Sequence, residues 1–339
     1  MNGQQRMRAA LRYLPVDRAP LQYYYTPVGF YEHGEKLNEL FAALPGDCEP
    51  FVRHSIPRPA ARDFDAEGNF HTLARDEWGT LWEKRIFGVT GIPREYPLAS
   101  WEDYAGYTLP PLPAFDAEKA RQAVAVHRQN YYALWGIGSL LETLKALRPD
   151  EEVLCDIALN DPRLHDLADR IVSRNSELLQ RAIAAGVDGI AFGDDYGTER
   201  GLLIGPDMWR HFVKPRLREL FRPAVRAGLD IVFHSCGKIG PILEDLREVG
   251  ATAIWPQLPA YDMPQLAQRC RELGLAVAIH TDRAKVMTRG TPSQVRELVQ
   301  REYDTFRVPE GGAWFYVEVD NGFPLANIEA LLNAIAQWR

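Results

Sequence analysis

The tetrapeptide His-Ser-Cys-Gly at residues 234–237 carries the most distinctive chemistry in this chain. In an extended backbone, residues i and i+2 point to the same side, so the imidazole of His234 and the thiol of Cys236 would converge on one point. A neutral imidazole and a thiolate are both good zinc ligands, and the pair would form half of a zinc site. Alternatively, His234 is a hydrogen-bonded residue and Cys236 a small buried hydrophobic residue.

A zinc site needs at least a third protein ligand, and a catalytic site also keeps an open position. Glu318 is the first candidate, because it lies near the C-terminal end of a predicted strand. Asp320 follows two residues later on the same face, and His280 is the third candidate. Cys270 would be chemically better, but it lies in a segment that is predicted to form an outer helix.

The elements that must position these residues are short apolar runs that alternate with helical patterns. Residues 162–185, for example, place apolar side chains close to a 3.6-residue period. Repeating strand–helix units with eight strands favour a single-domain α/β fold over residues 1–339, a closed (β/α)8 barrel of the TIM type. The eight predicted strands are 20–25, 49–53, 131–137, 187–192, 229–233, 252–256, 275–279 and 314–319.

Residues 54–115 interrupt this alternation and are predicted to be an insertion after the second strand. They contain the segment 76–83, which alternates like a two-stranded ribbon, and then a proline-rich segment. About 60 residues with so many turns would bury little core alone. We therefore expect the insertion to fold over one end of the barrel.

Further polar residues follow the predicted strands, at the end of the barrel where such enzymes hold their active sites. As structural alternatives, Asp194 and Asp195 would cap the next helix, Asp282 and Arg283 would form an ion pair that closes the top of the barrel, and Glu142 would be an acid favoured by a helix N-terminus. The predicted catalytic residues, which would position substrate or move a proton, are Asp194, Asp195, Asp282 and Glu142. The predicted substrate-binding residues are Tyr25, Tyr196, Gln257, His280 and Arg283.

Composition narrows the class of protein. The chain has 339 residues, 46% of them hydrophobic, and a formal net charge of −7. This charge argues against nucleic acid as a partner, and no apolar run reaches the roughly 20 residues of a membrane helix. Four cysteines without repeated spacing and an N-terminal segment without an apolar signal core predict a cytoplasmic protein with reduced thiols.

Two long segments, residues 189–206 and 233–250, resemble the uroporphyrinogen decarboxylase superfamily, as do residues 290–292 and 323–328. The strongest motifs are D-D-x-G-T-x-R-G and H-S-C-G, and the likeness covers nearly the whole chain from about Met7. The resemblance implies a (β/α)8 barrel. It also implies one of two activities: decarboxylation of uroporphyrinogen without a cofactor, or zinc-dependent methyl transfer to or from corrinoid proteins.

The decarboxylase branch has an R-Q-A-G-R-Y-L-P segment whose arginines hold substrate propionates. Here Arg12 begins a matching R-Y-L-P, but this precedes the first strand and the paired arginine is missing. The methyltransferase branch has H-x-C after the fifth strand and a later cysteine near the eighth. His234 and Cys236 match the first part, whereas Glu318 and Asp320 occupy the region of the later cysteine.

The resemblance therefore favours the methyltransferase branch. We expect a zinc-dependent methyltransferase or demethylase that moves a methyl group between a small substrate and a corrinoid protein. The cobalamin would be carried by that partner, and the superfamily suggests a homodimer. The alternatives are a uroporphyrinogen decarboxylase and a barrel that only binds a small molecule.

Overall fold

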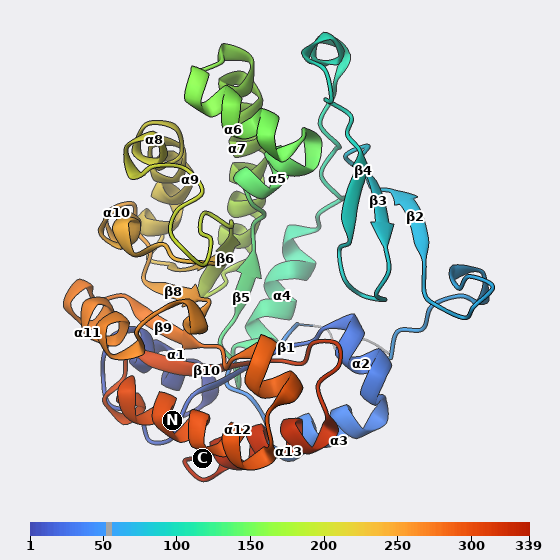
Figure 1. The fold of residues 1–339 in the computed structure, drawn as a ribbon. Coiled ribbons are helices and arrows are strands. Elements are labelled where there is room, and N and C mark those ends of the chain that lie inside the picture. The colour runs from blue at the N-terminus through green and yellow to red at the C-terminus, as the bar shows by residue number, and fades with distance from the viewer. Residues whose placement is uncertain (52–55) are drawn as a thin grey trace.

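The fold is built on a curled sheet of parallel strands with helices packed around it (Figure 1). The computed structural model describes residues 1–51 and 56–339. Neighbouring strands follow the order β1-β10-β9-β8-β7-β6-β5, and each pairing is parallel. The strands are β1 (Leu21–Tyr24), β5 (Leu134–Gly136), β6 (Gly189–Gly193), β7 (Asp230–Ser235), β8 (Ala253–Pro256), β9 (Ala276–Ile279) and β10 (Ala313–Glu318).

The strand predicted at residues 49–53 is not among the described strands, whereas the other seven predicted strands are present with shifted ends. Cys48 forms only an isolated parallel bridge with Gln22, and residues 52 and 53 lie outside the described residues. Pro45 and Pro50 flank this bridge, and proline cannot donate a ladder hydrogen bond. The complete eight-stranded barrel is therefore not what the described residues form.

The short segment at Asp47 and Cys48 nevertheless connects the two edge strands of the sheet. The backbone N–H of Tyr23, in β1, donates to the carbonyl of Cys48 at 3.2 Å. The N–H of Tyr132, just before β5, donates to the carbonyl of Asp47 at 2.8 Å. Main-chain hydrogen bonds of Asp47 and Cys48 thus link β1 to the start of β5. The isolated bridge at Cys48 lies next to the segment where the second strand was expected.

Helices follow the strands and cover the outer face of the sheet (Figure 1). The predicted helix at 162–185 is confirmed as α7, which Asp161 caps at its start and Gly186, with a positive φ, ends. The helices are α1 (Gly3–Leu11), α2 (Pro27–His33), α3 (Glu35–Ala43), α4 (Ala117–His127), α5 (Leu141–Leu147), α6 (Asp150–Leu159), α7 (Pro162–Ala185), α8 (Pro206–Phe212), α9 (Lys214–Arg226), α10 (Leu243–Glu248), α11 (Met263–Leu273), α12 (Pro292–Thr305) and α13 (Leu325–Ala336).

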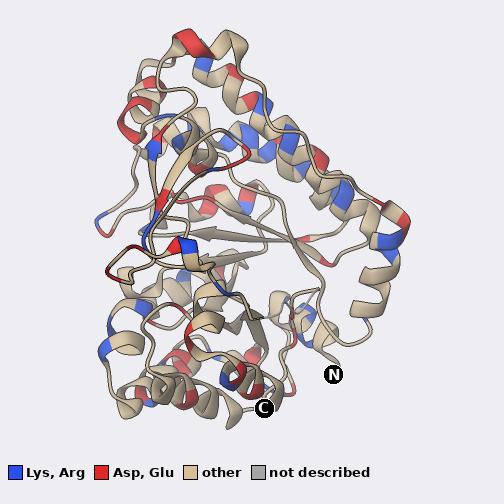
Figure 2. Ribbon diagram, turned by 90° about the vertical axis from the view of Figure 1, so that its right-hand side faces the viewer, with Lys and Arg blue, Asp and Glu red and all other residues tan. Residues whose placement is uncertain are grey.

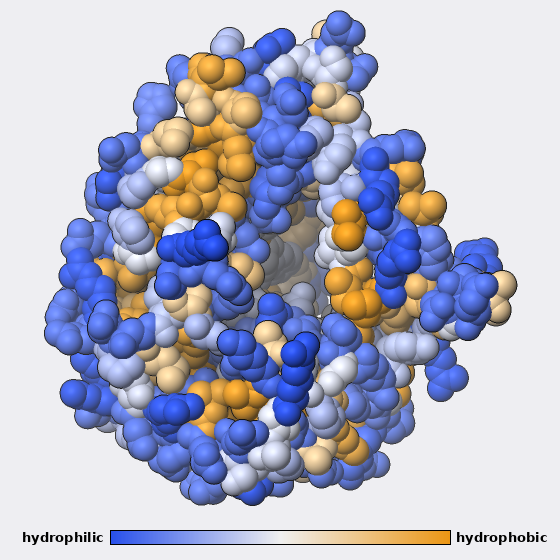
Figure 3. Space-filling model, in the orientation of Figure 1, coloured by the Kyte–Doolittle hydropathy of each residue, from blue (hydrophilic) through white to orange (hydrophobic). Residues whose placement is uncertain are grey.

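A second, antiparallel sheet stands beside the main fold. It consists of β2 (Thr72–Arg75), β3 (Leu81–Lys84) and β4 (Ile92–Glu95). The predicted ribbon at 76–83 is instead the turn between β2 and β3 together with most of β3. The Thr80 hydroxyl donates to the carbonyl of Ala146 in α5 at 2.7 Å, and Phe87 packs edge-on against Tyr31 of α2. The face seen in Figure 3 is hollowed near its centre, beside this sheet. That residues 54–115 form one insertion within one domain remains a prediction.

The hydrophobic core has two parts, one on each side of the curled sheet. The larger part lies between the strands and the helices. The smaller part contains residues from the other face of the strands, including Val232, Ala253, Ala278 and Tyr316. Side chains alternate between the two faces along a strand. A residue two positions after a member of this smaller, inner part of the core therefore also faces the inside of the curled sheet.

Charged residues lie mainly on the helices and loops, and both signs are interspersed there (Figure 2). The central strands carry almost none. No helix within the described residues is long and apolar enough to cross a membrane.

Candidate active site

The inward-facing side chains continue beyond the inner core into the loops at the C-terminal ends of β7 to β10. Four side chains with polar atoms each come two residues after a residue of the smaller, inner part of the core, so each lies on the same face of its strand as that residue. The four polar residues are His234, Trp255, His280 and Glu318. The periodicity of the strands is therefore what brings together residues that are far apart in the sequence.

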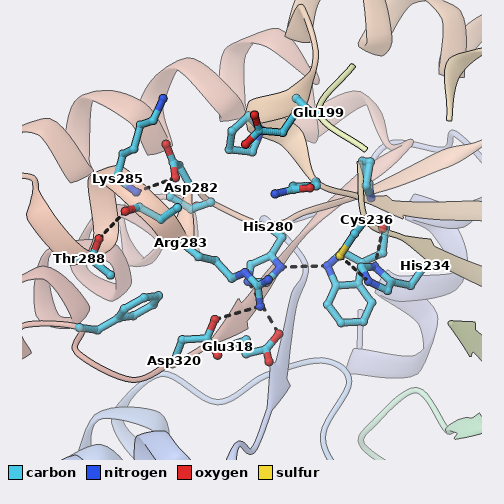
Figure 4. A pocket seen from close by; sticks show the side chains of 18 of the residues that line it. Glu199, His234, Cys236, His280, Asp282, Arg283, Lys285, Thr288, Glu318 and Asp320 are labelled. Atoms are coloured by element: carbon cyan, nitrogen blue, oxygen red, sulfur yellow. Dashed lines mark hydrogen bonds and ion pairs between the residues drawn. The ribbon is translucent and has the colours of Figure 1, made fainter. Parts of the chain in front are cut away.

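These side chains line a cavity of about 810 Å³ (Figure 4). This volume is within the usual range for small-molecule sites. The predicted site residues among its lining are His234, Cys236, Gln257, His280, Asp282, Arg283, Glu318 and Asp320. Other lining residues include Tyr24, Glu199, Lys238, Trp255, Lys285 and Phe323.

Three potential metal ligands converge at one side of this cavity: Asp195, His234 and Cys236. Within the described part of the chain, they are the one group of histidine, cysteine and carboxylate side chains whose ligand atoms all lie within 4.8 Å of one another. The Nε2 atom of His234 lies 3.5 Å from Sγ of Cys236 and 3.4 Å from Oδ1 of Asp195. His234 and Cys236 were predicted as ligands, whereas the residue beside them is Asp195 and not Glu318, Asp320 or His280.

Contacts between the loops after β6 and β7 hold Asp195 beside Cys236. Oδ1 of Asp195 accepts the backbone N–H of Cys236 at 2.8 Å, and the backbone N–H of Tyr196 donates to the Ser235 hydroxyl at 2.9 Å. Gly237 has a positive φ, and a Cβ there would collide with the backbone of Gly197. The glycine of the His-Ser-Cys-Gly motif is thus required for the close approach of the two loops.

The tautomer of His234 suits a metal ligand. Its Nδ1 atom lies 2.8 Å from the carbonyl oxygen of Trp255. Because a carbonyl oxygen can only accept, Nδ1 carries the proton, and burial lowers the pKa of the ring so that it is neutral. The lone pair is therefore on Nε2, which faces Cys236 and Asp195, and a backbone carbonyl commonly orients metal-binding histidines in this way.

The protonation of Cys236 depends on what it contacts. Burial, and then the negative charge of Asp195, raise the pKa of its thiol to about 12. Without a cation, Cys236 is thus a neutral thiol at pH 7, whereas a coordinating divalent ion deprotonates such a group. The donor set of one imidazole, one thiol and one carboxylate therefore fits zinc, as in catalytic sites with three protein ligands.

Glu318 and Asp320 have different partners. Oε2 of Glu318 lies 3.8 Å from Nε2 of His280, and Asp320 forms a 2.9 Å ion pair with Arg283. Burial raises the pKa of Glu318 to about 7. Both carboxylates line the cavity but lie outside the group around His234, because β10 is separated from β7 by two strands.

Asp194 has a structural environment, not that of the predicted catalytic acid. It is fully buried, and its carboxylate accepts the backbone N–H groups of Leu140, Leu141 and Glu142 at the start of α5. It also accepts the hydroxyl of Tyr196, which is itself completely buried and so does not line the cavity as expected. Asp194 therefore holds the start of α5, a helix that precedes it in the chain, whereas the alternative drawn from the sequence was a cap on the next helix.

The remaining predicted residues have clear positions. Glu142 forms an ion pair with Lys145 at 2.8 Å and does not line the cavity. Tyr25, which directly follows β1, packs on Phe30 beside the outer core, whereas Tyr24 at the end of β1 lines the cavity.

Two of the predicted substrate-binding and catalytic residues support the cavity through loop contacts. The side-chain carbonyl of Gln257 accepts the N–H of Gly237 at 2.9 Å. Asp282 caps the short π-helix Arg283–Met287 by accepting the N–H of Lys285. The predicted Asp282–Arg283 pair is replaced by the Arg283–Asp320 pair.

Trp255 is one of the site residues that the sequence analysis did not single out. Its carbonyl fixes His234, and its indole N–H donates to Nδ1 of His280 at 3.0 Å. The available signal was its position in a predicted strand, two residues after Ala253 on what proved to be the inner face.

Comparisons with known proteins show to which family this chain belongs. The model of the uroporphyrinogen decarboxylase (URO-D) family matches residues 149–338, which is more than half of the chain. The chain belongs to the uroporphyrinogen decarboxylase family. The resemblance inferred from the sequence is thus confirmed at the level of the family.

Solved structures show how far the fold is shared. A methyltransferase from Methanosarcina mazei is similar over 99% of this chain and 99% of its own, with a TM-score of 0.65 and 16% sequence identity. At this identity the likeness shows the fold alone. A dihydropteroate synthase from Xanthomonas albilineans is similar over 59% of this chain and 64% of its own, with a TM-score of 0.38 and 12% identity. A similarity at this TM-score is not used as evidence for the fold. No curated protein matches the chain.

Proposed function

We propose that this protein is a zinc-dependent methyltransferase or demethylase that moves a methyl group between a small substrate and a corrinoid partner protein. The convergence of Asp195, His234 and Cys236 beside a cavity of about 810 Å³ carries the proposal. The similarity in fold to the Methanosarcina mazei methyltransferase supports it.

Each of the three residues would have a defined role in holding the metal. His234 offers the Nε2 lone pair that its bond to the Trp255 carbonyl leaves free. Asp195 offers a carboxylate that is already oriented by the Cys236 N–H, and Cys236 offers its sulfur. Zinc held by these three residues would supply Lewis acidity.

The other residues would act on the substrate. The cavity wall formed by Tyr24, Trp255 and Phe323 would exclude water from the methyl group, and Asp282 at the π-helix would position the substrate or accept a proton. The methyl group would leave for, or arrive from, the cobalt of cobalamin carried by the partner.

The charges of the cavity disfavour uroporphyrinogen as the substrate. A tetrapyrrole with eight carboxylates needs several cations in its cleft. Arg12, from the R-Y-L-P segment, pairs at 2.7 Å with Asp230 at the start of β7, which is the opposite end of the strand from the cavity. The lining contains the four acidic side chains Glu199, Asp282, Glu318 and Asp320 and the three cationic side chains Lys238, Arg283 and Lys285.

Metal content tests the proposal and separates the candidate ligands. We expect about one zinc per chain in the purified protein, lost in His234→Ala and Asp195→Asn but retained in Glu318→Ala. Asp195→Asn keeps an acceptor for the Cys236 N–H, so its effect reports on ligation and not on folding. His211→Ala, an exposed histidine on α8, is the control and should retain zinc.

Elemental analysis by mass spectrometry measures zinc directly, and methyl transfer to added cob(I)alamin is the activity assay that follows. Absence of zinc after reconstitution would overturn the proposal and leave a decarboxylase or a barrel that only binds a ligand. Loss of zinc in His234→Ala and Glu318→Ala, with zinc retained in Asp195→Asn, would restore the ligand set predicted from the sequence.

A further inference from the structure

A second cavity lies at the opposite end of the sheet from His234 and Cys236. Its volume is about 550 Å³, which is within the usual range for small-molecule sites. Residues of one face of α11, of the end of α12 and of the segments where β9 and β10 begin line it (Figure 1). Two arginines of this lining, Arg271 and Arg307, have side chains that are 34% and 63% exposed. A solute can therefore reach their charged groups.

Tyr13, from the R-Y-L-P segment, forms a rigid wall of the second cavity. Its φ of 55° is in the left-handed region, and its hydroxyl donates to the carbonyl of Leu275 at 2.7 Å. A Cβ at Gly312 would collide with its ring, and the guanidinium group of Arg271 lies over that ring, 5.0 Å from the centre. The R-Y-L-P segment, which has no role in the proposed function, thus helps to build this cavity.

Arg307 occupies a backbone position that glycine usually fills. It directly follows the last residue of the α12 turn and has a φ of 48°, where a Cβ is disfavoured and helices commonly end on glycine. Within the described residues, three non-glycine residues have a positive φ, and Tyr13 and Arg307, two of the three, line the second cavity. Backbone strain of this kind is concentrated at functional sites. It indicates that the side chain of Arg307 is kept for what it does in the cavity.

The positive charges of Arg271 and Arg307 point to one place. The Nη1 atoms of the two side chains lie 3.7 Å and 3.8 Å from the same oxygen, Oε2 of Glu310, which is too far for a hydrogen bond. Arg271 also donates to the carbonyl of Gly311 at 3.3 Å. Glu310 is 57% exposed and is not part of the lining. Two guanidinium groups thus converge on a carboxylate to which neither is hydrogen-bonded.

The two acidic side chains of the lining, Glu272 and Asp304, have partners of their own. Glu272 accepts the side-chain amide of Gln268 at 2.9 Å and pairs with Arg269 at 3.4 Å. Asp304 accepts the side-chain amide of Gln300 at 3.0 Å. Within the described part of the chain, neither acid forms an ion pair with a cation of the lining. An anion that enters the cavity would therefore meet two arginines that the acids of the lining do not neutralise.

We propose that the second cavity binds a small carboxylic acid whose carboxylate contacts Arg271 and Arg307. A planar guanidinium group binds a carboxylate through two parallel hydrogen bonds, which makes arginine well suited to this ligand. The apolar body of the ligand would lie against Tyr13, Pro264 and Ala267, which line the same cavity. The site does not depend on the proposed function, because it is at the other end of the strands from the candidate metal ligands and needs no metal.

Benzoate, benzamide and acetate test the two parts of this ligand separately. In calorimetric titrations of the full-length protein, we expect benzoate to bind with a dissociation constant below about 1 mM. Benzamide has the same ring without the charge, and acetate has the charge without the ring. Each should bind at least about tenfold more weakly than benzoate, because each lacks one of the two contacts.

Three substitutions locate the site, and each has a different expected effect. Arg307→Gly should weaken benzoate binding at least about tenfold and raise the Tm of the free protein, because glycine relieves the strain at positive φ. Glu310→Ala should tighten binding about threefold or more, because it removes a competing carboxylate. Arg218→Ala, which breaks an exposed ion pair with Glu248, is the control and should leave binding unchanged.

Equal affinity for benzoate and benzamide, or unchanged benzoate binding in Arg307→Gly, would overturn the inference. A lower Tm in Arg307→Gly would also overturn it, because Arg307 would then support the fold. Tighter binding of inorganic phosphate than of benzoate would assign the two arginines to a different anion. Circular dichroism checks folding, and if Arg307→Gly is unfolded, Glu310→Ala and the three-probe comparison on the wild type decide.

The variant His234→Ala separates this site from the candidate metal site. It should bind benzoate as the wild type does. Loss of benzoate binding in this variant would place the carboxylate at the metal and defeat the inference. Absence of zinc from the wild type, together with normal benzoate binding, would defeat only the proposed function.

Discussion

At the scale of single residues, Trp255 gives two histidines opposite chemistry through its backbone and its side chain. The carbonyl of Trp255 fixes the proton of His234 on Nδ1, and its indole fixes the proton of His280 on Nε2. One ring thus presents a lone pair to Asp195 and Cys236, and the other presents an N–H to Glu318. Neither tautomer can be inferred from the identity of the histidine itself.

Asp194, a residue of the D-D-x-G-T-x-R-G motif, stabilises the fold by binding the backbone at the start of α5. We expect Asp194→Ala to lower the free energy of unfolding by about 3 kcal/mol, because three backbone N–H groups and a buried hydroxyl lose their acceptor. Chemical denaturation measures this change. Asp207→Ala, whose side chain is fully exposed, should change it by less than about 0.5 kcal/mol. Similar small effects for both variants would contradict the capping role.

At the scale of secondary-structure elements, α12 places an acid directly behind the cavity. Glu302 is 1% exposed and accepts the hydroxyl of Thr281, the residue between His280 and Asp282. Burial raises the pKa of Glu302 to about 8. The helix that supports this side of the cavity therefore packs best when Glu302 is protonated.

The stability of the fold should fall with rising pH because of this residue. Below about pH 4.5, Glu302 is protonated in both states. Between that pH and about 8, the unfolded chain ionises while the folded protein must keep Glu302 neutral, so folding loses free energy. Glu302→Gln should remove this loss, so its stability relative to the wild type should increase by roughly 3 kcal/mol between pH 5 and pH 8.

Thermal or chemical unfolding at the two pH values measures the difference. Glu297→Gln, at an exposed position on the same helix, is the matched control and should show no such dependence. A wild type and Glu302→Gln variant that respond equally to pH would show that Glu302 ionises freely in the folded protein.

At the scale of the whole molecule, the end of the sheet opposite the cavity is held by ion pairs between distant segments. Arg6 of α1 is 1% exposed and contacts Asp17 and the completely buried Asp47. Asp47 also pairs with Arg339, after α13, at 2.6 Å. These contacts join α1, the bridging segment beside β1 and the end of the described chain.

Breaking this network should destabilise the fold without altering the cavity. We expect Arg6→Ala to lower the free energy of unfolding by about 3–5 kcal/mol, because it removes a partner from a buried carboxylate. Arg269→Ala, which breaks an exposed pair with Glu244, should change it by less than about 0.5 kcal/mol. Zinc content of folded Arg6→Ala at low temperature should match the wild type, and a specific loss of zinc would contradict the separation of the two ends.

The sequence alone determined the features that depend on local patterns. The strand that ends in His234 and Cys236 was predictable because its apolar run is short and bounded by glycines, and the spacing of two fixed both side chains on one face. The helix at 162–185 was predictable from its period and its caps. Membership of the uroporphyrinogen decarboxylase family was also visible in the motifs around these segments.

Only the tertiary structure decided which distant residues meet. Strand order places Asp195 of the loop after β6 next to β7, whereas Glu318 on β10 lies two strands away beside His280. The role of Trp255 depends on contacts with the strands on both of its sides. Such contacts arise from register and loop packing between segments far apart in the chain, and the local spacing of residues does not encode them.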